Sequence, residues 1–255
     1  MRWLMLLGLL LSVLVQAGER IRYCDHPVYP PISWSDGQQM RGLAPEVVRA
    51  VFGELGYEVE IVTLGNWKRC LLDAAAGRVD AVLAYRTPQR DDGLLFSNVP
   101  VLREEVAIFY NRKHPVRFRQ LDDLARYRGG QLFGESYGPD FDRFVASHDN
   151  IEWVSTSRQN FGKLVRQRID FIVHERRTGR LFAEQLAGGE DIRALPTPLT
   201  VDYLRIAVSR HSPLAARMAE IDAALQRRVD DGSIAHWLDA SEAGYRVMLD
   251  GGVPR

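Results

Sequence analysis

One arginine of the chain stands where a ligand-binding group is expected. Arg90 ends the Thr-Pro-Gln-Arg run at 87–90, which follows an apolar segment, 79–84, typical of a strand buried on both faces. Ligands of α/β sheets bind beyond the carboxyl ends of the strands. We therefore expect Arg90 to bind a ligand. Arg86 is its competitor, and a surface ion pair with a neighbouring aspartate is the alternative.

An acidic residue and several aromatic residues are further candidates for ligand contact. Glu175 follows the apolar segment 169–173 and is a candidate for ligand contact, unless it only pairs with a neighbouring arginine at a solvated strand end. Trp67 precedes a predicted helix and Tyr29 lies in a proline-rich loop. Tryptophan and tyrosine are frequent at recognition surfaces, although Trp67 could equally belong to the core. Tyr85, which ends the strand before Arg90, is also a candidate.

The chain lacks the motifs of common catalytic sites. It has no Gly-x-Ser-x-Gly elbow, no phosphate-binding loop and no His-Glu-x-x-His helix. The paired carboxylates at 91–92 and 122–123 fall on turns, where such pairs usually face solvent. We expect no catalytic residue, no metal site and no cofactor.

Predicted helices and strands alternate along the chain and place these candidates at strand ends. The apolar spacing predicts helices at 43–55, 67–76, 141–146, 161–167, 178–186 and 214–229. A last helical turn is predicted at 234–238, and the last dozen residues are expected to be loosely held. Strands are predicted at 21–24, 58–63, 79–84, 106–110, 130–133, 151–154, 169–173 and 204–208. This alternation is typical of an α/β fold.

A short internal repetition predicts two similar lobes. The segment Arg78-Val79-Asp80-Ala81-Val82 is echoed by Arg168-Ile169-Asp170-Phe171-Ile172. In both places a helix leads through a basic turn into a strand that contains an aspartate. We therefore expect two related α/β units rather than one domain.

The amino terminus and the overall charge indicate an exported protein with a near-neutral surface. Residues 1–17 carry Arg2, an apolar run and Val15-Gln16-Ala17, which fits a signal-peptidase site; a retained anchor is the alternative. The 255 residues include 33 basic and 33 acidic side chains. This balance gives no reason to expect nucleic acid or a membrane surface as a partner.

The two cysteines, Cys24 and Cys70, both follow the predicted export signal. Exported thiols tend to be oxidised, and two cysteines at this spacing make no recognisable metal site. We expect a disulfide that closes a loop of about 45 residues and stabilises the protein by roughly 3–4 kcal/mol. Two unpaired buried thiols are the alternative.

An ordered set of short motifs resembles the periplasmic solute-binding proteins of the amino-acid type, the family 3 proteins that serve ABC importers. No single motif is specific, but together they span nearly all of the chain after the signal. The motifs are Tyr29-Pro30-Pro31, Gly42 with Pro45-Glu46-Val47, Trp67, Gly77-Arg78-Val79-Asp80, Thr87-Pro88-Gln89-Arg90 with Phe96-Ser97, Leu121-Asp122-Asp123-Leu124, Gly134, Ile169-Asp170, and Asp231-Gly232-Ser233-Ile234 with Trp237.

The resemblance implies two α/β lobes joined by two crossover strands, with a ligand cleft between them. Lobe 1 would comprise 18–102 and 203–255, and lobe 2 would comprise 103–202. Arg90 would hold the α-carboxylate of the ligand and Glu175 its ammonium group. Trp67 would cover the ligand side chain, Tyr29 would line the mouth, and Ser136 would supply a donor from lobe 2. Tyr85 and Thr87 complete the expected ligand-binding set.

Two features depart from the family pattern. The run between the strand aspartate and Thr87 is two residues shorter than usual and contains Ala84-Tyr85-Arg86, which makes an ordinary α-amino acid ligand less certain. The acidic residue often found after the first strand is displaced, with Asp25-His26 before a proline.

The resemblance predicts a monomeric periplasmic protein that binds a small polar metabolite, an amino acid or a related carboxylate, and presents it to an ABC permease. One alternative is a dehydratase of cyclohexadienyl substrates on the same scaffold, with Glu175 or His174 as the general acid. Another is a sensory module that hands its ligand-bound form to a membrane receptor.

Overall fold

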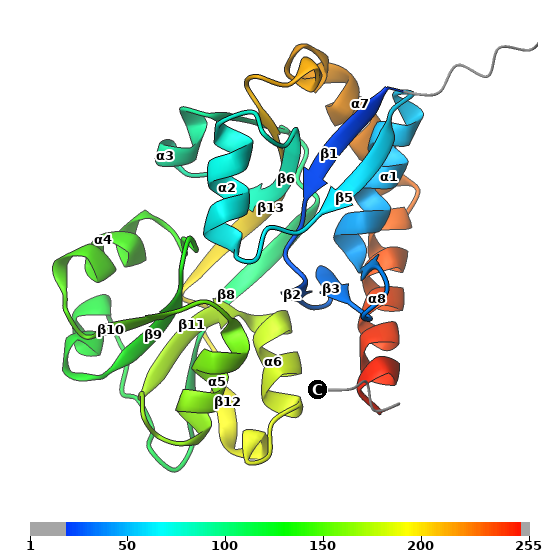
Figure 1. Cartoon of the computed structure of the whole chain (residues 1–255). Helices are drawn as coiled ribbons and strands as arrows, with labels where there is room; N and C mark the ends of the chain where they lie inside the picture. The colour runs from blue at the N-terminus through cyan, green and yellow to red at the C-terminus, as the bar shows by residue number, and fades with distance from the viewer. Residues whose placement is uncertain (1–18, 251–255) are drawn as a thin grey trace, which may run out of the picture.

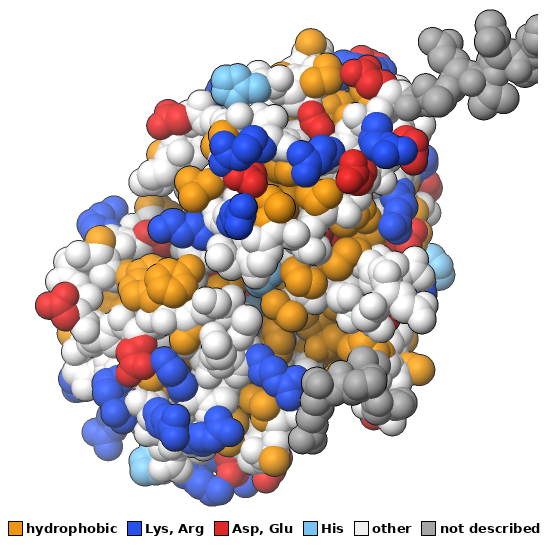
Figure 2. All heavy atoms as spheres, in the orientation of Figure 1, with side chains coloured by type: hydrophobic (Ala, Val, Ile, Leu, Met, Phe, Trp, Pro, Cys, Tyr) orange, Lys and Arg blue, Asp and Glu red, His pale blue; other side chains and the backbone are white. Residues whose placement is uncertain are grey.

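The computed structural model describes residues 19–250, so the predicted export signal lies outside the described residues. Figure 1 shows two α/β lobes, one above the other, joined by the long strands β8 and β13. The two-lobed α/β architecture predicted from the sequence is confirmed. Charged side chains of both signs are interspersed over the face shown in Figure 2.

Lobe 1 is built on the strands β1, β5 and β6 and on the second half of β13. β1 pairs in parallel with both β5 and β6, while β13 pairs antiparallel with β6 and β7. The elements are β1 (Arg20–Cys24), α1 (Leu43–Glu54), β5 (Glu58–Val62), α2 (Trp67–Ala75), β6 (Ala81–Tyr85), α3 (Pro88–Asp91) and β7 (Leu94–Phe96). A separate small sheet contains β2 (Val28–Tyr29), β3 (Ser33–Ser35) and β4 (Met40–Arg41).

Lobe 2 repeats this arrangement around β9 and β11. β9 pairs in parallel with β10 and β11, and β8 pairs antiparallel with β11 and β12. The elements are η1 (Leu121–Arg126), β9 (Gly129–Leu132), α4 (Pro139–Ser147), β10 (Ile151–Val154), α5 (Ser157–Val165), β11 (Phe171–Glu175), α6 (Arg176–Glu184), η2 (Gly189–Asp191) and β12 (Ile192–Ala194).

Two long strands cross between the lobes. The first half of β8 (Leu102–Asn111) pairs antiparallel with the first half of β13 (Thr200–Ser209). Beyond this shared segment β8 continues into lobe 2 and β13 into lobe 1. The predicted lobe boundaries at 102–103 and 202–203 fall on these strands, and they stay a prediction.

Three C-terminal elements return to lobe 1. They are η3 (Pro213–Arg217), α7 (Met218–Asp230) and α8 (Ser233–Asp250). Figure 1 shows α7 and α8 beside α1, with which both are in contact. The core between these helices and the sheet contains the buried face of α1, whose apolar positions follow the predicted helical spacing.

The prediction that the last dozen residues are loosely held is wrong for those that the structure describes, because α8 does not end at 238 but continues to Asp250. Its buried residues recur with a helical period at Ile234, Leu238, Ser241 and Tyr245. Tyr245 packs edge-on against Trp34 with ring centroids 5.4 Å apart, and Leu181 of lobe 2 completes this small cluster. Contact with β3 and α6 therefore supports the helix beyond its predicted end.

The predicted disulfide is confirmed: Cys24 of β1 is bonded to Cys70 of α2. Both side chains are buried in the core between α2 and the sheet. The bond ties α2 to the end of β1, close to the space between the lobes. In the described part of the chain, no helix is long and apolar enough to cross a membrane.

Candidate ligand-binding site

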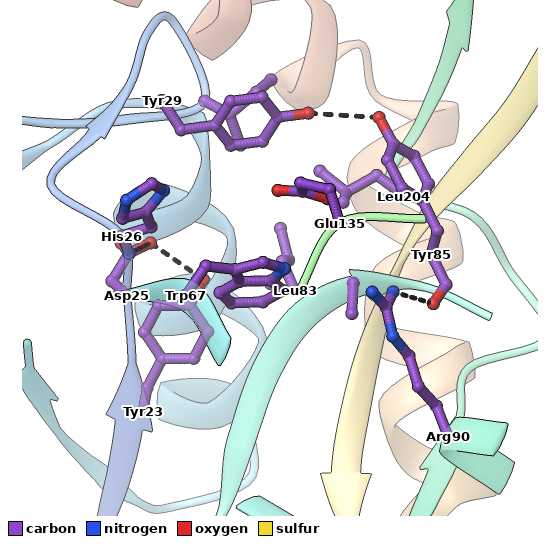
Figure 3. A pocket seen from close by; sticks show the side chains of 12 residues that line it. Tyr23, Asp25, His26, Tyr29, Trp67, Leu83, Tyr85, Arg90, Glu135 and Leu204 are labelled. Atoms are coloured by element: carbon purple, nitrogen blue, oxygen red, sulfur yellow. Dashed lines mark hydrogen bonds between the residues drawn. The ribbon is translucent and has the colours of Figure 1, made fainter. Parts of the chain in front are cut away.

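The candidate site begins where β6 ends and the chain turns into the short helix α3. β6 is buried along its whole length and ends at Tyr85. Thr87 caps α3, because its side-chain oxygen accepts a hydrogen bond from the Arg90 backbone N–H at 3.3 Å. Pro88 occupies the first turn, where its fixed φ favours the helix. This corner directs the Arg90 side chain toward a pocket (Figure 3).

Main-chain carbonyls from both lobes hold the Arg90 guanidinium. Nη1 donates to the Tyr85 carbonyl at 2.7 Å, and Nη2 donates to the Gly134 carbonyl of lobe 2 at 2.8 Å. No carboxylate of residues 19–250 forms an ion pair with it. Burial lowers the pKa of Arg90 and the charge of Glu135 opposes this shift, but an arginine stays charged in either case. The exposed Arg86, by contrast, is paired with Asp91 at 2.9 Å.

Arg90, Trp67, Tyr29 and Tyr85, four of the predicted site residues, line one pocket between the lobes. In Figure 3 the Trp67 indole lies in the middle of this pocket, with Arg90 on one side and Asp25 and His26 on the other. The Trp67 Nε1–H is buried and has no hydrogen-bond partner among the described residues. The remaining lining residues are Tyr23, Asp25, His26, Ile32, Leu83, Ala84, Glu135 and Leu204.

Glu175 lies behind this pocket and already has partners on both carboxylate oxygens. Tyr85 donates its hydroxyl to Oε1 at 2.9 Å across the two lobes, and the Tyr29 hydroxyl lies 3.1 Å from that of Tyr85. His174 Nδ1 is 2.7 Å from Oε2. The other ring nitrogen of His174 is 2.8 Å from the Ser157 hydroxyl. These contacts form a polar chain that joins the two lobes.

Thr87 and Ser136 line a neighbouring groove rather than this pocket. The Thr87 side-chain oxygen is the cap of α3, and the Ser136 hydroxyl donates to Asp142. Both residues therefore stabilise the loops that form the rim of the site.

Sequence reasoning missed the acidic residues of the pocket. Asp25 follows β1, and its neighbour His26 precedes a proline. In the sequence this pair only indicates a departure from the family pattern. Glu135 lies in the loop after β9, directly after the Gly134 whose carbonyl binds Arg90. Position beyond a parallel strand was the available signal for both residues. Glu104 of β8 is buried near Glu175, and no pattern in the sequence distinguished it.

Burial shifts the pKa values of these groups strongly. It raises the pKa of Asp25 to about 7 and that of Glu104 to about 8, the latter with help from the Glu175 charge. Burial and the Glu175 charge likewise raise the pKa of Glu135. Burial also acts to raise the pKa of Glu175, but His174 and Tyr85 hold it below its ordinary value. Burial lowers the pKa of His26 to about 4, so its imidazole is neutral at pH 7.

The donors of the pocket suit an organic ligand better than a metal ion. Residues 19–250 contain no group of three or more His, Cys, Asp or Glu side chains with the geometry of a metal site. A buried guanidinium, an unpartnered indole N–H and separate carboxyls can instead bind a zwitterion through complementary charges.

Comparison with known proteins places the chain in a family. The model of the bacterial extracellular solute-binding proteins, family 3, matches residues 21–240. No curated protein sequence matches the chain.

Solved structures share the fold at low sequence identity. An amino acid ABC transporter substrate-binding protein, AbpA, from Streptococcus pneumoniae bound to L-arginine has a TM-score of 0.74 and 16% identity, covering 92% of this chain and 97% of its own. A histidine kinase sensor domain with similarity to periplasmic binding proteins has a TM-score of 0.75 and 19% identity, covering 87% and 97%. AncCDT-1, an ancestral amino acid-binding protein and precursor of cyclohexadienyl dehydratase, has a TM-score of 0.72 and 18% identity, covering 87% and 94%.

These similarities establish the two-lobed fold, and the family match covers most of the sequence. The chain belongs to the bacterial extracellular solute-binding proteins, family 3.

Proposed function

We propose that the chain is a periplasmic binding protein that closes over an amino acid or related small carboxylate and delivers it to an ABC importer. The observation that carries this proposal is the state of Arg90. Its guanidinium is anchored by two carbonyls and lines the pocket without a carboxylate partner among residues 19–250. A ligand carboxylate supplies the missing charge, and guanidinium geometry suits it.

The contacts of Arg90 and Tyr85 join the two lobes and therefore depend on closure of the lobes. Arg90 and Tyr85 belong to lobe 1, whereas Gly134 and Glu175 belong to lobe 2, so the site is complete only when the lobes meet. The crossing strands β8 and β13 are the segments about which the lobes can rotate. A ligand that contacts both lobes shifts the population toward the closed state.

The test is ligand-induced thermal stabilisation with a panel of amino acids and small carboxylates. Arg90→Ala should remove the stabilisation given by the ligand that the native chain binds, and Arg90→Lys should retain only part of it. Arg86→Ala is the matched control, because it removes an arginine of the same corner that faces solvent. Unchanged stabilisation of Arg90→Ala would contradict the proposal, provided that circular dichroism shows the variant to be folded.

The partner of the closed form is the second part of the proposal. An importer and a sensor kinase both use this fold, as the two classes of similar structure show. Uptake of radiolabelled ligand by cells with and without the protein distinguishes them, since loss of the protein should abolish uptake by an importer. Scattering of the protein with and without ligand should show a change in the radius of gyration for either partner.

An enzymatic function is favoured by one observation, the buried carboxyl of Glu135 beside Arg90. Its raised pKa keeps a proton available at neutral pH, as a general acid requires. Turnover of prephenate or arogenate, lost in Glu135→Gln, would establish a dehydratase. Saturable binding of these compounds or of amino acids without turnover would support transport.

A further inference from the structure

The pocket contains more acidic groups than a simple zwitterion needs. Among the described residues, Arg90 is the only arginine or lysine that lines it, whereas Asp25 and Glu135 both line it and Glu175 lies directly behind it. His26 does not offset this excess, because burial keeps it neutral near pH 7. A ligand with one carboxylate and one ammonium group would satisfy Arg90 and Glu135 and would leave Asp25 without a partner.

Asp25 lies on the side of the pocket opposite Arg90. Figure 3 shows the Trp67 indole and Leu83 between them, which makes an apolar path across the pocket. Glu135 lies on the Arg90 side of this path, and its carboxyl forms no hydrogen bond with another described side chain. Across the pocket, the Arg90 guanidinium comes first and the Glu135 carboxyl second. The apolar side chains and then the Asp25 carboxyl follow.

The Asp25 carboxyl is buried and only partly satisfied. The side chain is 4% exposed. Oδ1 accepts from the His26 backbone N–H at 2.9 Å and lies 3.5 Å from the Tyr23 hydroxyl. Oδ2 has no hydrogen-bond partner in the described residues; the Ser33 hydroxyl is near enough to lower the Asp25 pKa but forms no bond of good geometry. A buried acceptor in this state costs stability unless a ligand satisfies it.

We propose that Asp25 receives a second positive charge, so that the ligand is an α-amino acid with a cationic side chain. The proposal rests on the amino-acid-binding function proposed above. The ligand carboxylate pairs with Arg90, and its aliphatic stem lies along Trp67. Its ammonium group pairs with Glu135, which gives up its proton when the ligand binds. The free space of the pocket is about 20 Å³, room for about one water molecule. The lobes must therefore stand farther apart around the ligand than they do here.

The charged groups that face Asp25 leave it free to titrate near neutral pH. Tyr23 of β1 and Ser33 of β3 lie against it, Arg49 of α1 acts at longer range, and His26 is its neighbour. Burial raises the pKa of Tyr23, so its hydroxyl stays protonated between pH 6 and 8. Burial places the Asp25 pKa at about 7, within this range. The carboxyl is then neutral below pH 7 and ionised above it.

Arginine and citrulline are the matched probes, because they have the same length and differ in the charge of the side-chain end. By calorimetry at pH 8 we expect arginine to bind about tenfold to a hundredfold more tightly than citrulline. This ratio should fall about tenfold from pH 8 to pH 6 as Asp25 gains a proton. At pH 7 arginine should release about half a proton more than citrulline, measured as a difference between titrations in phosphate and in Tris buffer.

Two variants test whether Asp25 causes the preference for arginine over citrulline. Asp25→Asn should reduce the arginine-to-citrulline ratio to near one and remove its pH dependence. Glu104→Gln is the control, since it neutralises a buried carboxyl that does not line the pocket, and it should preserve most of the ratio.

The outcomes separate this proposal from the function on which it rests. Equal binding of arginine and citrulline that still depends on Arg90 would overturn the Asp25 proposal and retain the amino-acid site. Binding of neither probe, nor of lysine or ornithine, would overturn the Asp25 proposal as well. Binding of cadaverine as tightly as lysine would overturn the part given to Arg90 and with it the amino-acid class. If Asp25→Asn does not fold, the comparison of arginine and citrulline on the native chain still tests the proposal.

Discussion

Segments 66–85 and 156–175 are two copies of one design, and comparing them separates residues that form the fold from residues that form the site. Asn66 and Thr156 cap their helices by accepting from the backbone N–H three residues later, at 3.0 and 3.3 Å. Asp80 and Asp170 accept from the backbone N–H of Arg22 and Arg128 at 2.7 and 2.8 Å. Every corresponding pair in this set satisfies backbone groups in the same way.

The copies differ at the positions that face the core and the cleft. Cys70 of α2 corresponds to Asn160 of α5, and the pocket residue Trp67 corresponds to Ser157, which contacts His174. The final residues of the two strands, Tyr85 and Glu175, also correspond, and they hydrogen-bond to each other across the lobes at a sequence separation of 90. Two equivalent positions thus carry a hydrogen-bond donor and an acceptor that pair with each other. The comparison teaches that the repeated residues build the lobes and the differing residues build the site.

Removal of the disulfide is expected to have the largest effect, and it would test whether lobe 1 depends on a bond that lobe 2 lacks. Replacing Cys24 and Cys70 with serine opens a loop of sequence separation 46. The free energy of unfolding should fall by about 4 kcal/mol, because the denatured chain regains the entropy of that loop. Urea denaturation measures the loss, with Asn160→Ala at the corresponding position of α5 as the control. A loss no larger than that of the control would contradict the asymmetry.

The contact between the two strand ends is tested by Tyr85→Phe. The variant leaves Glu175 Oε1 buried without its donor, which should cost about 1–3 kcal/mol. The lobes can relieve this cost by moving apart, so small-angle scattering without ligand should show a larger radius of gyration. Tyr203→Phe, on an exposed side chain of β13, is the control. An unchanged radius and an unchanged stability would show that the contact does not hold the lobes together.

The sequence predicted the repeated part of this comparison well and the differing part only in outline. The segment around Asp80 and its repetition around Asp170 could be recognised because an aspartate accepts a hydrogen bond from a backbone N–H at both places. The strand before Arg90 was predicted from its apolar run, and the structure places Arg90 at the pocket as the corner after that strand implied. Local patterns of this kind depend on neighbouring residues, which a sequence displays directly.

The acidic side of the pocket was not predicted, because it depends on contacts between distant segments. Asp25 and Glu135 are lone carboxylates in loops, and contacts with residues from other segments of the chain make them buried. Glu175 was predicted as a free acceptor of a ligand ammonium group, but Tyr85 and His174 occupy its two oxygens in this conformation. Burial and partners at long sequence separation leave no local pattern.

Removal of Asp80 or of Asp170 should lower the stability by similar amounts, because both accept a hydrogen bond from a backbone N–H. Asp80→Ala and Asp170→Ala each remove a charged acceptor from a backbone N–H, and each should lower the free energy of unfolding by about 1–2 kcal/mol. Asp80 should lose slightly more, because it also accepts from the Ser212 hydroxyl at 2.7 Å. Neither change should alter the ligand affinity of the native fold. A loss at only one position, measured by urea denaturation, would show that the two copies differ even in their backbone contacts.

The smallest effects are expected at the turns before the two strands, where the copies differ in residue but share a conformation. Gly77 has φ 73 and Gln167 has φ 57, both in the left-handed region. Gly77→Ala should destabilise by about 1 kcal/mol or more, because a left-handed backbone disfavours a Cβ and the new atom would lie 2.7 Å from the His211 Cβ. Gln167→Gly should instead stabilise by up to about 1 kcal/mol, since it relieves the strain of a side chain in this region. Thermal denaturation of the pair measures both signs, and a loss of stability in Gln167→Gly would show that the Gln167 side chain has a role that its counterpart lacks.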